Sequence, residues 1–439
     1  MAINRTHVKS TMLRALRHRN YRLFFSGQSV SLIGTWMTRL ATAWLVWRLT
    51  HSAEMLGLIG FAGQVPSFLF ASIAGVWVDR LNRHRLLTLT QTLAMLQSLT
   101  LATLVLSGRI EIWEIFALQI FQGVINAFDM PTRQSLLIDL LDDRRDLSNA
   151  VALNSTMVNG ARLIGPTLAG LIIASIGEGW CFLIDGLSYL AVIISLSLMH
   201  LNLQVRTGKR KRVIHELYDG FRYAFGFSPI RAILLLLALF GLVGIPFRVL
   251  MPVITTQSLQ GNAHTLGFLM GAMGIGALAG ALYLASRASV VGLGRMIPVA
   301  VTIFGISLIG IGLSHWYAFS LLLMVTTGFG FMVQLAVSNT LLQTLVREEM
   351  RGRIMSLYTM AFMGMATFGS LLAGTIAGVI GAPFTLVIAG VFCIAGALGF
   401  AYKLPMLREH ARPVYIEKGI LPLADESLRE ATALEEKVE

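Results

Sequence analysis

The chain has 439 residues, of which 55% are hydrophobic and 13% charged, and its net charge is +12 at neutral pH. A mean hydropathy of +0.70 means more apolar surface than a soluble core of this size can bury, so a bilayer must cover the excess. A soluble fold is thereby excluded. The positive charge does not indicate a nucleic-acid partner, because the basic residues lie in the gaps between apolar segments.

Twelve apolar stretches are long enough to cross a bilayer as helices of about 20 residues. They begin near Arg22, Glu54, Arg85, Ile112, Ser148, Trp180, Ile230, Thr265, Arg295, Trp316, Gly352 and Ala382. Six spans, a basic linker and six further spans repeat one layout, which is common among transporters. We therefore predict an all-α membrane protein with twelve transmembrane helices in two pseudo-symmetric six-helix bundles. The predicted parts are a basic amino terminus (1–21), a first bundle (22–200), a linker (201–229), a second bundle (230–403) and a polar tail (404–439).

The basic residues predict the orientation of these spans. Thirty of the 35 lysines and arginines lie at the two termini or in alternate gaps, whereas the other gaps hold only Arg48 and Arg109. Because cytoplasmic loops are enriched in Lys and Arg, both termini are predicted to be cytoplasmic in a multi-pass protein of the inner (plasma) membrane.

Small residues recur at four-residue spacing in the second, fifth, eighth and eleventh spans. These stripes are Gly63, Ser67, Ala71 and Gly75; Ala161, Gly165 and Ala169; Gly267 and Gly271; and Ser370, Gly374 and Gly378. Small residues let helix backbones approach closely in a membrane. Either the stripes serve ordinary helix packing, or the two bundles pack through these four spans and slide against each other there.

Three arginines, Arg39, Arg162 and Arg248, lie inside predicted spans, where a charge costs roughly 2.5–3.5 kcal/mol on insertion scales. Two of them share polar stripes that should face a cavity; the stripe members are Gln28 and Thr35 with Arg39, and Asn159 and Pro166 with Arg162. The sequence therefore suggests a positively biased cavity for an anionic or polyphenolic cargo such as a catecholate siderophore. Alternatively, the arginines pair with backbone carbonyls or extend to the interface.

No acidic residue occurs between Asp219 and Glu348, so a proton-carrying carboxylate must come from the first half. The candidates are Asp79, Asp129 and Asp185, with Glu111 and Glu114 near the outer surface. Asp185 is favoured, because it lies inside an otherwise apolar span and a buried acid binds protons more readily than a solvated one. The alternative is an acid that is simply hydrogen-bonded to a neighbouring helix.

Two motifs resemble those of the major facilitator superfamily. The run Gly75-Val-Trp-Val-Asp-Arg-Leu-Asn-Arg-His-Arg85 resembles its loop signature, and Gly160-Ala-Arg-Leu-Ile-Gly-Pro-Thr-Leu-Ala-Gly170 resembles its antiporter motif, with Gly165, Pro166, Ala169 and Gly170 at the motif positions. The similarity covers residues 14–403 and is greatest to the branch that holds the enterobactin exporter and drug and macrolide effluxers. It implies the major facilitator fold, and export as the direction of transport.

The resemblance also implies a cytoplasmic gate. Its expected members are Gly75, Asp79, Arg80, Arg83, Asp129 and Arg133. Asp79 would face the amino-terminal end of the eleventh span, and Arg83 would bridge to Asp129. The alternative is a static surface ion pair. Span four has Gln119 where many proton-coupled members have arginine, so the usual proton-coupling arrangement of the superfamily is not supported.

The predicted function is a secondary active transporter that exports siderophore-like or drug-like molecules by alternating access, in exchange for protons. The alternative is a lysolipid or metabolite transporter of the same fold; a channel or sensor is a further one. No catalytic, cofactor or metal motif is visible, so an enzyme is not expected. The expected partners are the lipid bilayer, a small-molecule substrate and protons, and the protein is expected to be a monomer.

Overall fold

The computed structural model describes residues 13–199, 213–287 and 289–421, and within these residues the secondary structure is helical. The first bundle contains six long helices. They are α2 (Arg19–Thr50), α3 (Ala53–Arg80), α4 (Arg83–Leu106), α5 (Ile112–Asp139), α6 (Leu147–Ile176) and α7 (Glu178–Ser197). A short 3-10 helix, η1 (Arg14–Arg17), precedes them, and a second, η2 (Arg144–Asp146), lies between α5 and α6.

The second bundle also has six spans, two of which are interrupted. The first interrupted span consists of α9 (Ser228–Leu239), η3 (Phe240–Gly244), α10 (Phe247–Val253) and η4 (Ile254–Ser258), and the second of η5 (Glu348–Met350), α14 (Arg351–Thr359), η6 (Met360–Gly364) and α15 (Met365–Ile380). The continuous ones are α11 (Ala263–Ala285), α12 (Leu293–Leu313), α13 (Tyr317–Leu345) and α16 (Ala382–Glu417). A short helix, α8 (Val213–Gly226), precedes this bundle.

All twelve predicted spans are confirmed as helices that begin close to the expected residues. Among the described residues, ten helical segments are long and apolar enough to cross a membrane. The other two long helices of the first bundle, α2 and α5, fall outside this set. The last helix continues past residue 403 to Glu417, and the predicted linker contains α8; residues 200–212 of that linker lie outside the described part of the chain.

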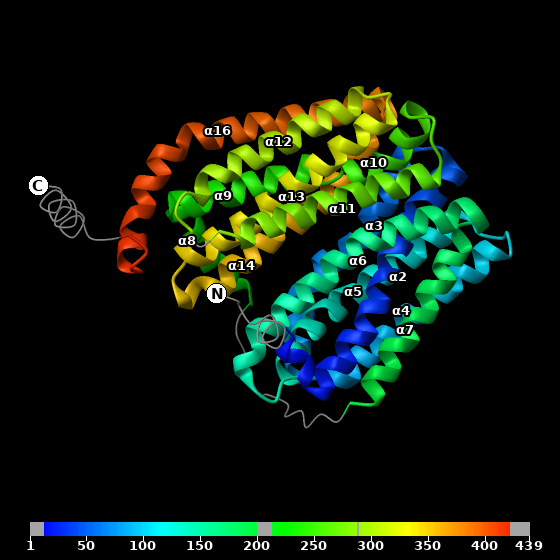
Figure 1. Ribbon diagram of the computed structural model, residues 1–439, viewed down its shortest axis with the longest axis horizontal. Helices are drawn as coiled ribbons and strands as arrows, with labels where there is room; N and C mark the ends of the chain where they lie inside the picture. Colours follow the sequence, from blue (N-terminus) through cyan, green and yellow to red (C-terminus); the bar gives the residue numbers. More distant parts are fainter. Residues whose placement is uncertain (1–12, 200–212, 288, 422–439) are drawn as a thin grey trace, which may run out of the picture.

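The two bundles touch at one end of the molecule and diverge toward the other (Figure 1). We call the first the closed end; it carries the turns between α2 and α3 and between α15 and α16. The open end carries the turns between α3 and α4 and between α5 and α6. The open end is the one at which the sequence gathers its basic residues.

Two glycine pairs form the closed end. Helix α3 crosses α15 where a β-carbon added at Gly57 would lie 2.8 Å from the Cα of Gly374, and helix α6 crosses α11 where one added at Gly170 would lie 2.7 Å from the Cα of Gly267. Real β-carbons do not approach other atoms this closely, so only glycine permits these crossings.

The crossings join the second span to the eleventh and the fifth to the eighth. The prediction that the bundles pack through these four spans is thus confirmed. In α3 the crossing is made by Gly57 and not by the predicted stripe, because Gly63 packs on Gln119 and Ser67 donates to the Gly123 carbonyl, both on α5 of the same bundle.

We predict that Gly170→Ala separates the bundles at the closed end, because the added methyl group would meet backbone atoms of α11. Spin labels at positions 109 and 316, both in closed-end turns and placed in a background lacking Cys181 and Cys393, should show a longer distance population by pulsed electron resonance. The matched control is Gly160→Ala in the same helix, where a β-carbon would meet nothing within 4 Å. Equal distance distributions in the two variants would contradict the interpretation.

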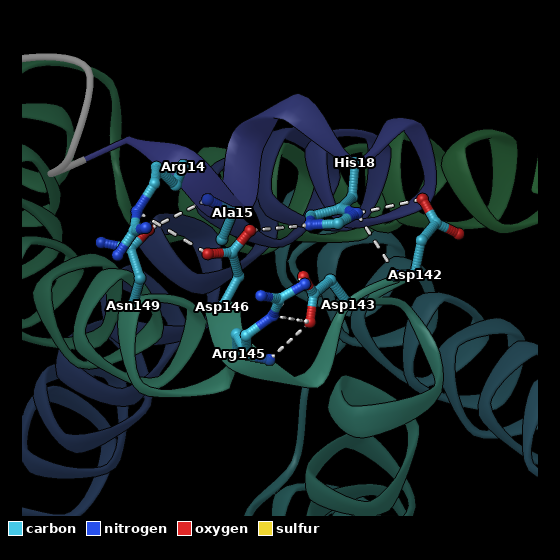
Figure 2. A network of polar contacts seen from close by, with 8 residues as sticks. All are labelled: Arg14, Ala15, His18, Asp142, Asp143, Arg145, Asp146 and Asn149. Carbon is cyan, nitrogen blue, oxygen red and sulfur yellow. Dashed lines mark hydrogen bonds and ion pairs between the residues drawn. The ribbon is translucent and has the colours of Figure 1, made fainter.

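A polar network ties the amino-terminal segment to the first bundle at the open end (Figure 2). The His18 ring lies 3.0 Å from Asp142 through Nδ1 and 3.1 Å from Asp146 through Nε2, and Asp146 also pairs with Arg14 at 3.7 Å. The hydrogen bond to Asp142 is the main cause that raises the pKa of His18 above 6.5, and Asp146 adds to it. A neutral imidazole has one N–H and can donate to only one of the two carboxylates, whereas the protonated ring can donate to both.

We predict that His18→Gln lowers the midpoint of thermal unfolding by about 1–3 °C near pH 6 and by less near pH 9. Because the pKa of His18 is raised in the folded protein, its stabilising effect is complete below about pH 6.5 and is lost as the pH rises through the folded pKa. Melting curves of the purified protein in detergent at both pH values would check this. An equal loss at both would assign His18 a role independent of its charge.

Candidate functional site

The three membrane arginines come together where the two bundles meet. Arg39 comes from α2 and Arg162 from α6 in the first bundle, whereas Arg248 comes from α10 in the second. Two aromatic side chains lie between them: Trp36, one turn before Arg39 on α2, and Phe331 on α13. The sequence predicted a common cavity for these arginines, and the structure brings them together.

The Trp36 ring is shared by two guanidinium groups. The Cζ atom of Arg39 lies 4.6 Å from the centre of the ring and that of Arg162 lies 5.2 Å from it. Both distances are in the range of cation–π attraction, which contributes roughly 0.5–2 kcal/mol depending on exposure.

The Phe331 ring repeats this arrangement across the bundle boundary. The Cζ atom of Arg162 lies 6.0 Å from the ring centre and that of Arg248 lies 4.6 Å from it. Arg39, Trp36, Arg162, Phe331 and Arg248 thus alternate cation and ring, and we call these five residues the arginine–aromatic stack. Its link between the bundles is the contact of Arg162 with Phe331.

The arginines of the stack lack acidic partners. Within the described residues, no carboxylate lies within 4.0 Å of any of the three guanidinium groups. The Nε atom of Arg162 and the Nε and Nη2 atoms of Arg248 are buried without a hydrogen-bond acceptor. Arg39 is exposed although it lies near the middle of α2. The stack therefore presents positive charge and free donors between the bundles.

An irregular helix presents Arg248. Its short helix α10 lies between the π-helical segments η3 and η4, with Pro246 before it and Pro252 within it. Proline cannot donate the backbone hydrogen bond of a regular helix, and π-helical turns recur at functional positions. Local departures from the regular helix thus surround the one stack cation that the second bundle supplies.

The antiporter-like motif holds α6 against two neighbours. A β-carbon at Gly165 would lie 2.5 Å from Cβ of Trp36, so this glycine lets α6 lie directly on the stack residue of α2. One turn and a half later, Gly170 makes the crossing with α11. Pro166 and Ala169 are buried between these contacts. The motif therefore positions Arg162 beside Trp36 and also lets α6 pack against α11 at the closed end.

Asp185 lies behind the stack, buried between α7, α2 and α4. Its Oδ2 atom is 2.9 Å from the hydroxyl of Thr38 and 3.0 Å from that of Ser98, while its Oδ1 atom is buried with no partner. The Ser98 hydroxyl also lies 3.0 Å from the carbonyl of Phe182. If Ser98 donates to that carbonyl, its oxygen can accept from a protonated Asp185. The site thus accommodates a neutral acid.

The other predicted cavity residues do not join the stack by direct hydrogen bonds. Gln28 is buried with both amide atoms unpartnered, and Thr35 donates to the Ser31 carbonyl within its own helix. Asn159 donates to the Ser155 carbonyl in the same way. Gln119 lies against Gly63 of α3.

The expected bridge between Arg83 and Asp129 is not made. Arg83 pairs with Asp139 at 2.7 Å, whereas Asp129 is buried and pairs with Arg133, with further bonds from Thr90 and Gln91. Asp129 and Asp139 are ten residues apart on α5, which is about 15 Å along a helix, so a side chain at the end of α4 that reaches one does not reach the other.

The remaining gate positions are on helix α3. Arg80 is exposed at the open end. Asp79 and Gly75 lie in α3, but their side-chain surroundings fall outside the part of the chain that the structure describes. The gate role of these residues stays a prediction.

Comparison with known families decides the identity of the chain. Residues 10–419 match the family described as transmembrane secretion effector, which belongs to the major facilitator superfamily. The chain belongs to this family. It is therefore a multi-pass membrane transporter and not an enzyme.

The relatives of this transporter are siderophore and drug transporters. It is 28% identical to the staphyloferrin A transporter of Staphylococcus aureus, over 87% of this chain and 95% of that protein. It is 26% identical to the enterobactin exporter EntS of Escherichia coli, over 81% and 85% of the two chains. The multidrug efflux pump Tap of Mycolicibacterium fortuitum is 25% identical, over 86% and 93%.

Solved structures agree in fold. A bacterial homologue of the lysosomal transporter Spinster, in an inward-facing and occupied conformation, superposes with a TM-score of 0.69 at 14% identity, covering 89% of this chain and 97% of that one. The nucleoside transporter NupG gives a TM-score of 0.69 at 12% identity, covering 88% and 98%. At these identities the likeness concerns the major facilitator fold alone.

Sequence reasoning missed the contribution of α13 to this transporter's site. Phe331 supplies the second shared ring, and one turn further along the helix Gln334 is buried with both amide atoms unpartnered. The sequence held a signal for Gln334, because a polar side chain inside an apolar span is rare and costs free energy. The aromatic ring carried no such signal, since the chain has 24 phenylalanines.

Proposed function

We propose that this transporter moves small organic molecules out of the cell by alternating access, in exchange for protons, with both termini in the cytoplasm. The observation that carries the proposal is the combination of a closed end, a diverging open end and an unneutralised polar site at their junction. Export as the direction is supported by the siderophore and drug exporters among the relatives.

Alternating access is supported by the pseudo-symmetry of the closed end. The second span corresponds to the eighth and the fifth to the eleventh, so the Gly57–Gly374 and Gly170–Gly267 crossings are equivalent to each other in the two-bundle repeat. Two bundles that touch at two matching crossings can rock about that contact as rigid bodies, which opens one end as the other closes. A cytoplasmic open end is supported by the basic residues gathered there, since cytoplasmic loops are enriched in Lys and Arg, and cargo would then load from the cytosol.

Proton exchange is supported by Asp185. It is a buried carboxylate with one unpartnered oxygen, and the adjacent residues Thr38 and Arg39 connect it to the stack through α2. A proton moved through 100 mV releases about 2.3 kcal/mol, which is enough to concentrate a cargo. Because Gln119 occupies the position at which many proton-coupled members have arginine, a different residue must carry the proton. Asp185 is the residue that we propose.

Transport into inside-out membrane vesicles tests the proposal. With an imposed proton gradient, acidic inside, we predict saturable accumulation of at least one compound from a panel of carboxylates, catecholates, macrolides and lysolipids. Vesicles that carry the Gly170→Ala variant should accumulate less. Accumulation that ignores the proton gradient would remove the exchange mechanism, and flux that never saturates would indicate a channel.

We predict that Asp185→Asn lowers proton-driven accumulation by roughly tenfold or more, because an amide cannot release a proton, while cargo-for-cargo exchange across the membrane persists. The matched control is Asp143→Asn, which removes a carboxylate at the open-end surface that pairs only with Arg145 in its own turn. If both variants keep proton-driven transport, Asp185 is a structural acid.

A further inference from the structure

The arginine–aromatic stack holds three cations at one place with no matching anions. The second half of the chain cannot supply one there, because it has no acidic residue from 220 to 347, and its remaining acids lie near the ends of its spans or in the tail. In the first half, Asp185 is the acid that lies near Arg39, but its Oδ2 atom accepts from the Thr38 and Ser98 hydroxyls and the carboxylate forms no ion pair with Arg39 within the described residues.

The two rings hold the cations without neutralising them. A ring face attracts a guanidinium plane but accepts few of its N–H groups, so the N–H edges remain available. Three guanidinium atoms, Nε of Arg162 and Nε and Nη2 of Arg248, are buried with no acceptor at all. Buried donors without acceptors are rare, and each one calls for a partner that the chain itself does not provide.

We propose that the stack is the binding site for a cargo that carries two or more carboxylates. This inference rests on the proposed transport function and names the substrate class. An arginine fork matches the two oxygens of a carboxylate, which gives parallel charge-assisted hydrogen bonds. Because Arg39 and Arg162 share one ring and Arg162 and Arg248 share the next, neighbouring forks are within the span of a small organic molecule.

The division of the cations between the bundles favours a polyvalent cargo over a single anion. Arg39 and Arg162 belong to the first bundle and Arg248 to the second, so one carboxylate alone engages one side. A molecule with several carboxylates joins the two sides. Its binding would add cargo-dependent contacts across the boundary where the bundles rock, at the Arg162–Phe331 link.

Equilibrium binding of a defined probe tests the assignment without any transport step. The probe is propane-1,2,3-tricarboxylate, and its neutral trimethyl ester is the matched control ligand; both are titrated into the full-length protein in lipid nanodiscs by calorimetry. We expect the tricarboxylate to bind and the ester not to bind. Arg39→Gln, Arg162→Gln and Arg248→Gln should each weaken the tricarboxylate about tenfold or more.

A matched protein control is Arg22→Gln, which removes an exposed arginine from the open end of the same helix α2 and should leave the affinity unchanged. Arg→Lys variants at the three stack positions keep the charge and lose the fork, so they should bind with intermediate affinity. Tryptophan fluorescence gives a second readout: the change on tricarboxylate binding should be lost in Trp36→Phe, while calorimetry still detects the ligand.

Several results would overturn the assignment. They are equal binding of acid and ester, unchanged affinity in all three glutamine variants, and equally tight binding of inorganic phosphate or chloride. The acid and ester comparison needs no variant, so it decides the matter even if a substitution prevents folding. Failure of the transport proposal is read separately, as absent proton-driven accumulation in vesicles by a protein that still binds the tricarboxylate.

Discussion

The close approach of helix backbones at the two glycine crossings is the constraint on which the rest of this structure depends. At each crossing the backbones are too near for any side chain, so the four helices involved have a fixed lateral position relative to one another. Without water to drive helix association inside a bilayer, such packing and hydrogen bonding must hold a membrane protein together. The crossings shut one end and fix where the bundles begin to diverge, and the polar site lies at that junction.

The arginine–aromatic stack is energetically unusual because it gathers like charges in a medium of low polarity. Each arginine carries an insertion penalty of roughly 2.5–3.5 kcal/mol, and a ring contact returns roughly 0.5–2 kcal/mol. The net free energy of placing the three arginines there stays unfavourable unless water or an anionic ligand accepts hydrogen bonds from the free N–H groups. Arg39 is accessible, so water can reach one part of the stack, whereas the unpartnered atoms of Arg248 are enclosed. The site therefore lowers the stability of the folded protein while it keeps hydrogen-bond donors available to a ligand.

Much of this architecture could be predicted from the sequence because hydropathy and charge placement act locally. The twelve spans follow from the length of the apolar runs, and the packing through the second, fifth, eighth and eleventh spans follows from their small residues. The convergence of Arg39, Arg162 and Arg248 follows from charges placed where lipid would demand apolar side chains. These signals belong to single helices and need no knowledge of their neighbours.

The prediction that failed and the residue that was missed depend on how far along its helix a side chain lies and on which side chains of other helices surround it. The bridge from Arg83 to Asp129 is what the family resemblance implies, whereas in the structure Arg83 pairs with Asp139, ten residues further along α5. Phe331 was missed because its role depends on the two guanidinium groups beside it, which come from other helices. Which end of the molecule stands open is likewise a property of the relative position of two bundles, and no residue pattern encodes it.

The sharing of each ring by two arginines has an evolutionary consequence. Trp36 positions Arg39 and Arg162 together, and Phe331 positions Arg162 and Arg248, so replacing one member shifts the neighbours of the next. Descendants that acquire a new cargo should therefore change these positions in correlated sets. Arg162, which borders both rings, should be the last of them to vary.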